Sequence, residues 1–395
     1  MKRRHVLSSF ASATGAALLA AHAPGWAQAA AQRPASIADR ILVLVELKGG
    51  NDGLNTIVPH ADATYYQVRN TIAIQPADVL KLDERTGLHP ALNAALPLWE
   101  KGELAIVQGV GYPQPNLSHF RSIEIWETGS RAAEYLDEGW VTRGMKAGFG
   151  AQAHYTAEGV LIGSNDFGPL AGARAVALNN PEAFVNQARF AMPREATGNP
   201  ALQHLLRVEN DVSVAAQGLR GEKYNFSTEF PQGRFGSAVR AACQVVASQR
   251  GKAGVPVITL TLGSFDTHQN QLGAHANLLR QLAEGLAALK SALLELGAWD
   301  RTLVMTFSEF GRRPRQNNSG GTDHGTAAAH FVTGGAVRGG LYGQAPDLTR
   351  LDASQNVAFS TDFRQLYATV AKDWWGVNPD SVVRGRFEPV KFLRA

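Results

Sequence analysis

The chain has 395 residues, 45% of them hydrophobic, which is enough to bury a sizeable core. Its formal net charge is +4, and this falls to +1 without the three basic residues of an N-terminal segment that we expect to be removed. Such a near balance of charge gives no support to nucleic-acid binding. Cys243 is the only cysteine, which excludes an internal disulfide and a cysteine-ligated zinc site.

The first 29 residues have the pattern of a signal peptide. Paired arginines, Arg3 and Arg4, precede a short, weakly apolar, alanine-rich run, and residues 27–29 (AQA) form a small-x-small cleavage pattern. This pattern favours the twin-arginine export route, with an ordinary secretory signal or a chance arginine pair as the alternative. We therefore expect cleavage near Ala29, a periplasmic or secreted protein, and the twin-arginine export machinery as a partner. No apolar run approaches the roughly 20 residues of a membrane span, so none is expected.

After a polar lead-in at residues 30–40, strands of the buried type alternate with amphipathic helices. Ile41–Leu47 (ILVLVEL), for example, is a run of branched apolar residues typical of a strand buried on both faces. The predicted strands are Ile41–Leu47, Leu104–Val110, Gly159–Gly163, Val255–Leu262, Thr302–Phe307 and His330–Thr333. The predicted helices are His89–Lys101, Ser118–Thr128, Pro200–Leu219, Arg234–Arg250, Gln271–Leu296 and Asp362–Trp375.

This alternation predicts an α/β fold with a parallel or mostly parallel sheet that helices cover on both faces. The sequence contains no internal repeat and no low-complexity linker, so we expect one large domain over residues 41–395. Ligands of such sheets bind beyond the carboxyl ends of the strands. The segments that follow the predicted strands are therefore where functional side chains are expected.

Three acids lie just past the carboxyl ends of predicted strands: Asp52 in a Gly-Gly-Asn-Asp-Gly turn, Asp266, and Glu309. Asp, Asn and Gly are also common in turns for backbone reasons, so each acid taken alone has a purely structural interpretation. Their shared position at strand ends favours a functional one.

Histidines accompany these acids, because His268 follows Asp266 by two residues and Asp323-His324 ends the loop after Glu309. A surface histidine in a turn is the alternative for His268. Carboxylates and neutral imidazoles suit zinc, manganese or another divalent ion of similar hardness. They do not suit copper(I) or an iron–sulfur cluster, which prefer sulfur ligands.

Ser118 lies where a loop turns into a predicted helix, so free backbone N–H groups and the helix dipole favour an anion there. A serine beside a metal could ionise and act as a nucleophile, although serine at a helix start is more often an N-cap. Arg121 follows one turn later. His119, Arg312 and Arg313 are candidates for contact with an anionic substrate, with solvated surface positions as the alternative.

Together these motifs resemble the domain of unknown function 1501 family of bacterial proteins, many of which carry twin-arginine signals. The resemblance runs from about Ile41 to the C-terminus. The matching pieces, in order, are GGNDGLN (49–55), NLSHFRSIEIWETG (116–129), FDTHQNQ (265–271), SEFGRRP (308–314) and TDHGTAAAHFVTGG (322–335).

That family is similar in turn to the alkaline phosphatase and sulfatase superfamily, which implies a three-layer αβα sandwich with a two-metal site at the strand ends. By this resemblance, one metal is held by Asp266, His268 and His324, and a second by Asp52, Ser118 and Glu309, with Asp323 as a further ligand. Arg121 and Arg313 neutralise charge on the transferred group. The implied order also includes a late Thr-Asp helix start, which Ser360–Phe363 fits.

The chain departs from the superfamily pattern at two of these positions. The acid and histidine of the middle segment are separated by one residue, in Asp266-Thr-His268, where the superfamily has three. The acid at the strand end is followed by Phe310, where the superfamily has a histidine ligand. The number of metal ions, one or two, therefore stays open.

The sequence thus predicts a periplasmic metal-dependent hydrolase that acts on a phosphate ester, a sulfate ester or another small anionic ester through a metal-activated serine. Zinc and manganese are the expected metals. The alternative is a non-catalytic metal- or ligand-binding module on the same fold, since a fold does not fix a function.

Overall fold

The structure of the chain is a computed structural model. It describes residues 39–149, 155–178, 223–249 and 254–394, together with residues 203, 214, 215 and 217. The predicted signal peptide lies outside the described residues, and the predicted helix Pro200–Leu219 lies mostly outside them. In the part that is described, no helix is both long and apolar enough to cross a membrane.

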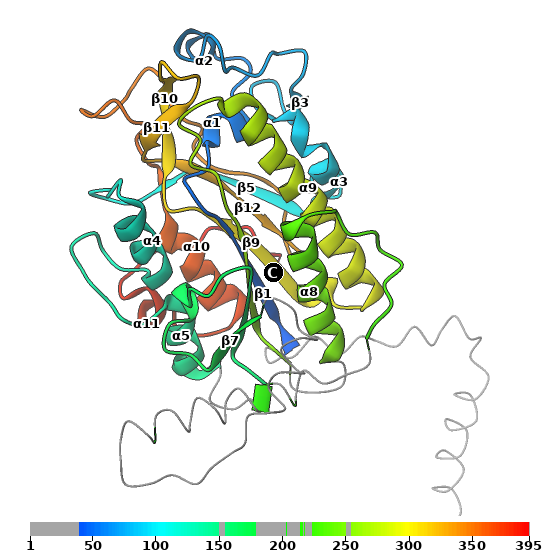
Figure 1. Ribbon diagram of the computed structural model, residues 1–395. Helices are drawn as coiled ribbons and strands as arrows, with labels where there is room; N and C mark the ends of the chain where they lie inside the picture. The colour runs from blue at the N-terminus through cyan, green and yellow to red at the C-terminus, as the bar shows by residue number, and fades with distance from the viewer. Residues whose placement is uncertain are drawn as a thin grey trace, which may run out of the picture. The chain divides into compact units, whose positions relative to one another are not determined.

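A nine-stranded sheet forms the centre of the fold (Figure 1). All its strand pairs are parallel except the two made by β12, which confirms the predicted mostly parallel sheet. Its path, from edge to edge, is β13 (Gly340–Gly343), β5 (Leu104–Gly111), β12 (Ala328–Thr333), β9 (Thr302–Phe307), β1 (Ile41–Leu47), β8 (Val257–Leu262), β6 (Gly159–Ile162) and β7 (Ala175–Leu178), with β14 (Thr361–Asp362) beside β5.

Strand β1 shows why the central strands are apolar throughout. All seven of its residues are buried, because both faces of the sheet are covered. Ile41, Val43 and Val45 point into one hydrophobic cluster, whereas Leu42 and Leu44 point into another. This alternation follows from the two-residue period of a strand.

Helices cover each face of the sheet, which confirms the predicted three layers (Figure 1). One cluster contains buried residues of the helices α3 (Leu96–Glu100), α8 (Arg234–Ser248) and α9 (Gln271–Glu295). The cluster on the other face contains buried residues of α4 (His119–Thr128), α5 (Trp140–Gly144), α10 (Phe363–Thr369) and α11 (Pro379–Val383).

Two segments differ from the sequence-based prediction. The helix expected at His89–Lys101 is a 3-10 turn, Pro90–Ala95, followed by the short α3, which has a proline, Pro97, in its first turn. Between Glu309 and Ala327, where we expected only a loop, an antiparallel hairpin forms from β10 (Gly311–Gln316) and β11 (Thr322–Gly325). Its charged, proline-containing sequence lacks the apolar alternation that signals a strand.

Short helical turns also form at Met145–Phe149, Gly168–Leu170, Trp299–Arg301 and Val370–Trp374. Further short elements lie between β1 and β5 in the sequence. They are α1 (Gly53–Thr56), α2 (Ala63–Val68) and a three-stranded sheet of β2 (Ile57–Val58), β4 (Gly87–Leu88) and β3 (Leu80–Lys81).

The direction of β12 decides which segments meet. Because β1, β5, β8 and β9 run the same way, their carboxyl ends lie along one edge of the sheet. β12 runs the opposite way, so the hairpin β10–β11, which precedes it, lies at this same edge. The loops after four strands and the segment before a fifth are thereby brought together.

Buried histidines predict a stability that falls in mild acid. Burial lowers the pKa of His89 to about 4, and those of His275 and His330 to about 3, below the value of about 6.5 in an unfolded chain. The unfolded state therefore binds protons first, and the free energy of unfolding falls as the pH drops below about 6.5. Each histidine contributes a slope of up to about 1.4 kcal/mol per pH unit.

Urea unfolding with a chelator present, between about pH 7 and about pH 5, measures this slope. His330→Leu should remove roughly one third of it, because one of the three histidines is then absent. A free energy of unfolding that stays constant over this range would contradict the neutral, buried state of these side chains.

Candidate metal centre

Asp266, in the loop after β8, is the acceptor at the middle of the candidate site. Its Oδ1 accepts a hydrogen bond of 2.6 Å from Nη2 of Arg312, whose side chain is fully buried. Partial burial opposes ionisation of Asp266, but the bond to Arg312 and its charge outweigh this, and the pKa is lowered to about 2. Asp266 is therefore a carboxylate at neutral pH, and its side chain is 44% exposed.

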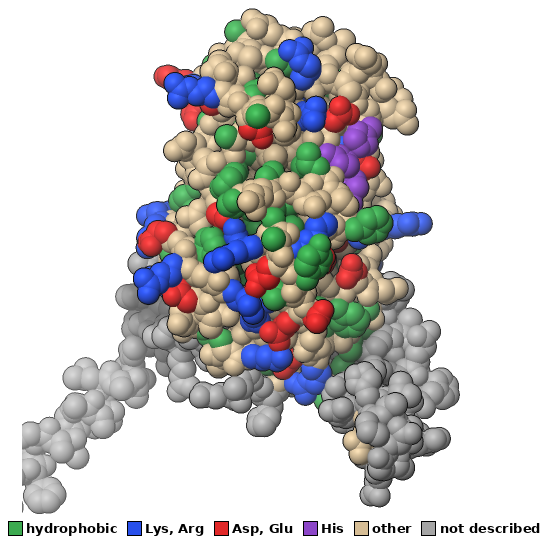
Figure 2. Space-filling view, turned by 90° about the vertical axis from the view of Figure 1, so that its left-hand side faces the viewer, with side chains coloured by type: hydrophobic (Ala, Val, Ile, Leu, Met, Phe, Trp, Pro, Cys, Tyr) green, Lys and Arg blue, Asp and Glu red, His purple; other side chains and the backbone are tan. Residues whose placement is uncertain are grey.

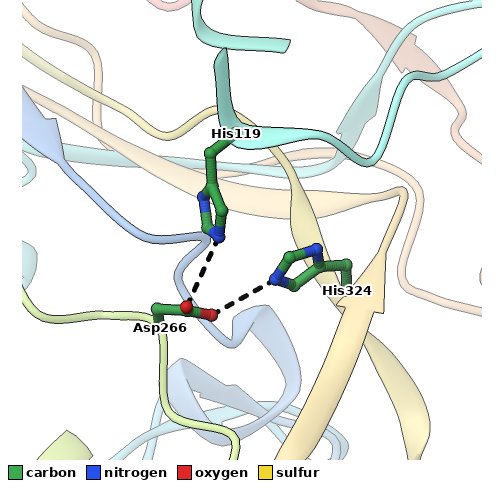
Figure 3. A group of neighbouring side chains, drawn as sticks. All are labelled: His119, Asp266 and His324. Atoms are coloured by element: carbon green, nitrogen blue, oxygen red, sulfur yellow. Dashed lines mark hydrogen bonds and ion pairs between the residues drawn. The ribbon is translucent and has the colours of Figure 1, made fainter. Parts of the chain in front are cut away.

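Two imidazoles face this carboxylate (Figure 3). Nε2 of His324, on β11, lies 3.2 Å from Oδ1 of Asp266, and Nε2 of His119, at the start of α4, lies 3.4 Å from Oδ2. Candidate ligand atoms of the three residues all lie within 4.8 Å of one another. In this figure the three side chains point toward a common centre from three separate elements.

Hydrogen bonds on the far side of each ring fix which nitrogen faces Asp266. Nδ1 of His324 lies 2.8 Å from the carbonyl oxygen of Leu117, which can only accept, so Nδ1 carries the proton. Nδ1 of His119 lies 2.8 Å from Oε1 of Glu309, which acts in the same way. In the neutral ring, each Nε2 then presents a lone pair to the Asp266 carboxylate.

Lone pairs of two imidazoles and a carboxylate repel one another unless a cation lies between them. Burial lowers the pKa of His324, the charge of Arg312 lowers it further, and bonds to Leu117 and Asp266 oppose the shift. The protonated form of His324 is thereby disfavoured. The arrangement is consequently one that could hold a metal cation.

Glu309 lies behind His119. It is 2% exposed, and its carboxylate accepts hydrogen bonds from the backbone N–H of Gly49, at 2.9 and 3.1 Å, as well as its contact with His119. Its own carbonyl oxygen accepts from the hydroxyl of Ser122. The sequence suggested Glu309 as a metal ligand. In this geometry its carboxylate instead orients the imidazole of His119.

His268 and Asp323 border the cluster. Nε2 of His268 lies 3.0 Å from Oδ1 of Asp266 and 3.0 Å from Nε2 of His324. Its Nδ1 lies 3.6 Å from Oδ1 of Asp323, which is 54% exposed. The structure thus brings together four of the six predicted metal ligands, Asp266, His268, Asp323 and His324, and sets Glu309 directly behind them.

Asp52, in contrast, lies in the protein interior, away from solvent. It is fully buried, and its oxygens accept from the backbone N–H groups of Leu54 and Asn55, from the Gln271 amide and from Arg69. Burial would raise its pKa, but the charge and hydrogen bonds of Arg69 lower it. These partners occupy its acceptor positions, so the geometry makes Asp52 the counter-ion of a buried arginine.

The two candidate serines differ in their exposure to solvent. Ser118 is exposed at the N-cap position of α4, next to His119, and among the described residues its side chain makes no capping hydrogen bond. Ser122 is fully buried and bonded to Tyr112 and Glu309, so only Ser118 of the two serines faces solvent.

Of the three candidate arginines, Arg121 has its partners outside the cluster. Arg121 donates to the carbonyl oxygens of Ala132 and Glu134 and stacks over Tyr135, with 3.8 Å between its Cζ and the ring centroid. Arg313 follows Arg312 in β10, and side chains of adjacent strand residues point to opposite faces. The contacts of Arg121 are therefore structural, and Nε of Arg313 is buried without a hydrogen-bond partner among the described residues.

Three residues have contacts that the sequence did not predict. Arg312 donates to the backbone carbonyls of Gly49, Gly50, Phe265 and Thr322 in addition to Asp266. Phe310 packs against His119 and His324 with ring centroids 4.9 and 4.4 Å apart. Arg69 belongs to no motif, and its partner Asp52 is 17 residues away.

The cluster lies at the molecular surface. His119, His268 and His324 are partly exposed, with 34%, 42% and 22% of their side chains accessible. Figure 2 shows histidine side chains gathered on the surface, with acidic side chains beside them. A dissolved ion and a small ligand can therefore reach the site.

The fold and the site together define a mixed α/β protein with histidines and an acid gathered at the strand ends. Residues 204–385 match the model of a family described as "Protein of unknown function (DUF1501)", which confirms the predicted family over those residues. FDTHQNQ, SEFGRRP and TDHGTAAAHFVTGG lie inside the match, and the two earlier motifs precede it. A search of curated protein sequences finds no match.

Solved structures to which the chain is similar include sulfatases and phosphoester-type hydrolases. The phosphonate monoester hydrolase SpPMH of Silicibacter pomeroyi is 14% identical, with 90% of this chain and 78% of that chain covered and a TM-score of 0.40. The PsFucS1 sulfatase of Pseudoalteromonas sp. is 10% identical, with 89% of this chain and 70% of that chain covered and a TM-score of 0.41. The C-terminal periplasmic domain of EptC from Escherichia coli, in complex with Zn, is 12% identical, with 89% of this chain and 88% of that chain covered and a TM-score of 0.40.

Gly321 offers a test of how closely the loop after β8 must approach the hairpin. A Cβ at this position would lie 2.2 Å from the carbonyl carbon of His268 and 2.5 Å from the carbonyl oxygen of Thr267. Both are backbone atoms, so Gly321→Ala should lower the free energy of unfolding by about 1–3 kcal/mol. Gly273→Ala, in α9 with nothing within 4 Å of the added Cβ, is the matched control and should be neutral or stabilising. Equal stability of the two variants in urea unfolding would contradict this packing.

Proposed function

We propose that this protein is a metal-dependent hydrolase of small anionic esters, with His119, Asp266 and His324 as the metal ligands. The observation that carries the proposal is the convergence of two Nε2 lone pairs on an ionised carboxylate at an exposed sheet edge. Known sites of this kind pair such ligands with an accessible position for substrate.

The separations within the cluster fit a divalent ion. Two ligand atoms that each lie about 2.1 Å from a tetrahedral ion are roughly 3.4 Å apart. Nε2 of His119 lies 3.4 Å from Oδ2 of Asp266 and Nε2 of His324 lies 3.2 Å from Oδ1, both near this value, and one ligand atom from each of the three residues lies within 4.8 Å of the others. Nitrogen and carboxylate ligands suit zinc or manganese. His268 and Asp323, which border the three ligands, would complete the coordination of this ion or bind a second one.

Ser118 is the proposed nucleophile. It is exposed, it immediately precedes the proposed ligand His119, and it lies at the N-terminus of the ten-residue helix α4. The free backbone N–H groups of that first turn favour the negative charge of the ester group. A bound divalent ion would polarise an ester oxygen and lower the pKa of a neighbouring hydroxyl.

Phosphate and sulfate esters are the proposed substrate classes, and the reaction is proposed to take place outside the cytoplasm, in a single domain over residues 41–395. The basic start and arginine pair of residues 1–29 support twin-arginine export, with cleavage near Ala29. The names of the similar structures, a sulfatase and a phosphonate monoester hydrolase among them, agree with an anionic ester.

A second candidate function is a metal-binding module without turnover. It is favoured by Phe310, which packs against two of the proposed ligands where a further ligand would be expected, and by the pairing of Asp52 with Arg69. Each feature removes one ligand position from a two-metal site. Without a second ion, the attacking and leaving oxygens of the ester are not both stabilised by metal.

Metal content tests the ligand set. Protein purified without chelators should hold close to one divalent ion per chain. Because it removes a direct ligand, His324→Ala should lower affinity by more than the roughly 10–100-fold typical of losing an outer-shell partner. His60→Ala, outside the cluster, is the control and should bind as the unmodified protein does. Two ions per chain would bring His268 and Asp323 into the ligand set, and none, even with added zinc or manganese, would refute the proposal.

Ester hydrolysis tests the nucleophile. With aryl phosphate and aryl sulfate esters as substrates, Ser118→Ala should lower kcat by several orders of magnitude while metal content and stability stay unchanged. Ser354→Ala, at another exposed serine, is the control. Hydrolysis at the normal rate by Ser118→Ala would remove this residue from the mechanism, and absence of turnover in the metal-loaded parent protein would favour the binding module.

A further inference from the structure

A buried polar chain runs beneath the candidate metal centre. It begins at Arg69, whose guanidinium is fully buried and donates to Asp52, to Asn55 and to the carbonyl oxygens of Arg313 and Pro314. It continues from Asp52 to the side-chain amide of Gln271, the first residue of α9. All donors of Arg69 are thus used, and its charge is matched by one carboxylate.

The amide of Gln271 is held in one orientation. Asp52 can only accept a hydrogen bond while it is ionised, so it must face the Nε2 group of Gln271. The Oε1 atom then faces the other way and accepts from two hydroxyls, Thr322 at 2.7 Å and Thr267 at 3.1 Å. Gln271 and Thr322 are 0% exposed and Thr267 is 5% exposed, so water does not compete for these bonds.

The two threonines belong to the two segments that carry the ligand-type residues. Thr267 lies between Asp266 and His268 in the loop after β8, and Thr322 is two residues before His324 in β11. One amide oxygen therefore joins both segments from below. On the outer side, backbone bonds from Asn270 to Ser319 and from Gln271 to Gly320 join them again.

We infer that Gln271 is a positioning residue that holds the loop after β8 and strand β11 at a fixed separation, so that Asp266, His268 and His324 converge. The assignment of a metal to that convergence rests on the proposed function. The positioning itself is a property of the protein without metal. Asp52, rather than binding the ion, anchors the Gln271 amide. This amide acts on the separation of the two segments together with Arg312 and the backbone bond from Thr322 to Thr267.

Amide hydrogen exchange of the metal-free protein, read by segment, is the first test. Gln271→Met keeps a similar volume but removes the donor and the acceptor, and it should speed exchange about tenfold in both residues 263–270 and β11. Thr267→Val should do so only in the loop, and Thr322→Val only in β11. Gln281→Met, in the same helix with its bond on the exposed side, is the matched control and should leave both segments unchanged.

The threonine variants keep the test decisive if Gln271→Met does not fold. Thr322→Ser retains the hydroxyl and should restore normal exchange in β11. Unchanged exchange in the threonine variants would overturn the inference. A uniform rise that includes the buried strand β1 would also overturn it, because that result signals general destabilisation and no local positioning.

Metal affinity separates this inference from the proposed function. If the unmodified protein binds zinc or manganese, Gln271→Met and Thr322→Val should bind it about 10–100-fold more weakly. Equal affinity would overturn the positioning role while the hydrolase proposal stands. If the unmodified protein binds neither ion, the proposed function fails, and the exchange pattern still decides the inference.

Discussion

The buried guanidinium of Arg312 is the interaction on which the arrangement of the strand ends depends. It reaches the carbonyls of Gly49 and Gly50 after β1, Phe265 after β8 and Thr322 in β11, all without contact with solvent. A buried positive charge is costly unless it is paired and hydrogen-bonded. Asp266 supplies the paired charge, so the residue that neutralises the interior also faces the surface cluster.

This double role links the packing of three segments to the electrostatics of the site. The bond from Arg312 keeps Asp266 ionised and fixes its Oδ1, while Oδ2 remains directed at His119. Glu309 and the Leu117 carbonyl fix the two imidazoles from behind in a comparable way. The candidate site is therefore rigid because each of its members is also a hydrogen-bonded part of the protein framework.

Much of the fold could be predicted because its signals are local. Runs such as Ile41–Leu47 and Thr302–Phe307 are apolar at every position, which indicates strands covered on both sides. The carboxyl ends of two predicted strands, Val255–Leu262 and Thr302–Phe307, then indicated Asp266 and the loop that carries His324 as candidate site segments. The hairpin β10–β11 could not be predicted, since its strands are stabilised by contacts of Arg312 and Arg69 and not by an apolar pattern.

Asp52 shows where local reasoning fails. Its turn, Gly-Gly-Asn-Asp-Gly, places an acid just past the end of a strand, as the turn Gly-Ser-Phe-Asp-Thr places Asp266, so position along the chain does not separate the two acids. The two acids differ in their partners. Asp52 is fully buried and bonded to Arg69, at the end of α2, and to Gln271, whereas Arg312 leaves one oxygen of the partly exposed Asp266 to face His119. Partners of this kind are set by tertiary contacts, which no spacing within a motif records.

Charge balance bears on how many ions the site can hold. Around the cluster, Asp266 and Glu309 supply two carboxyl groups and Arg312 one positive charge, with Asp323 exposed at the rim. The formal charges of Asp266, Glu309, Asp323 and Arg312 sum to −2, which one divalent ion would balance. A second ion would need further carboxylates, yet Asp52 is already neutralised by Arg69 and Phe310 contributes no ligand atom. Within the proposed function, these formal charges therefore favour one ion over two.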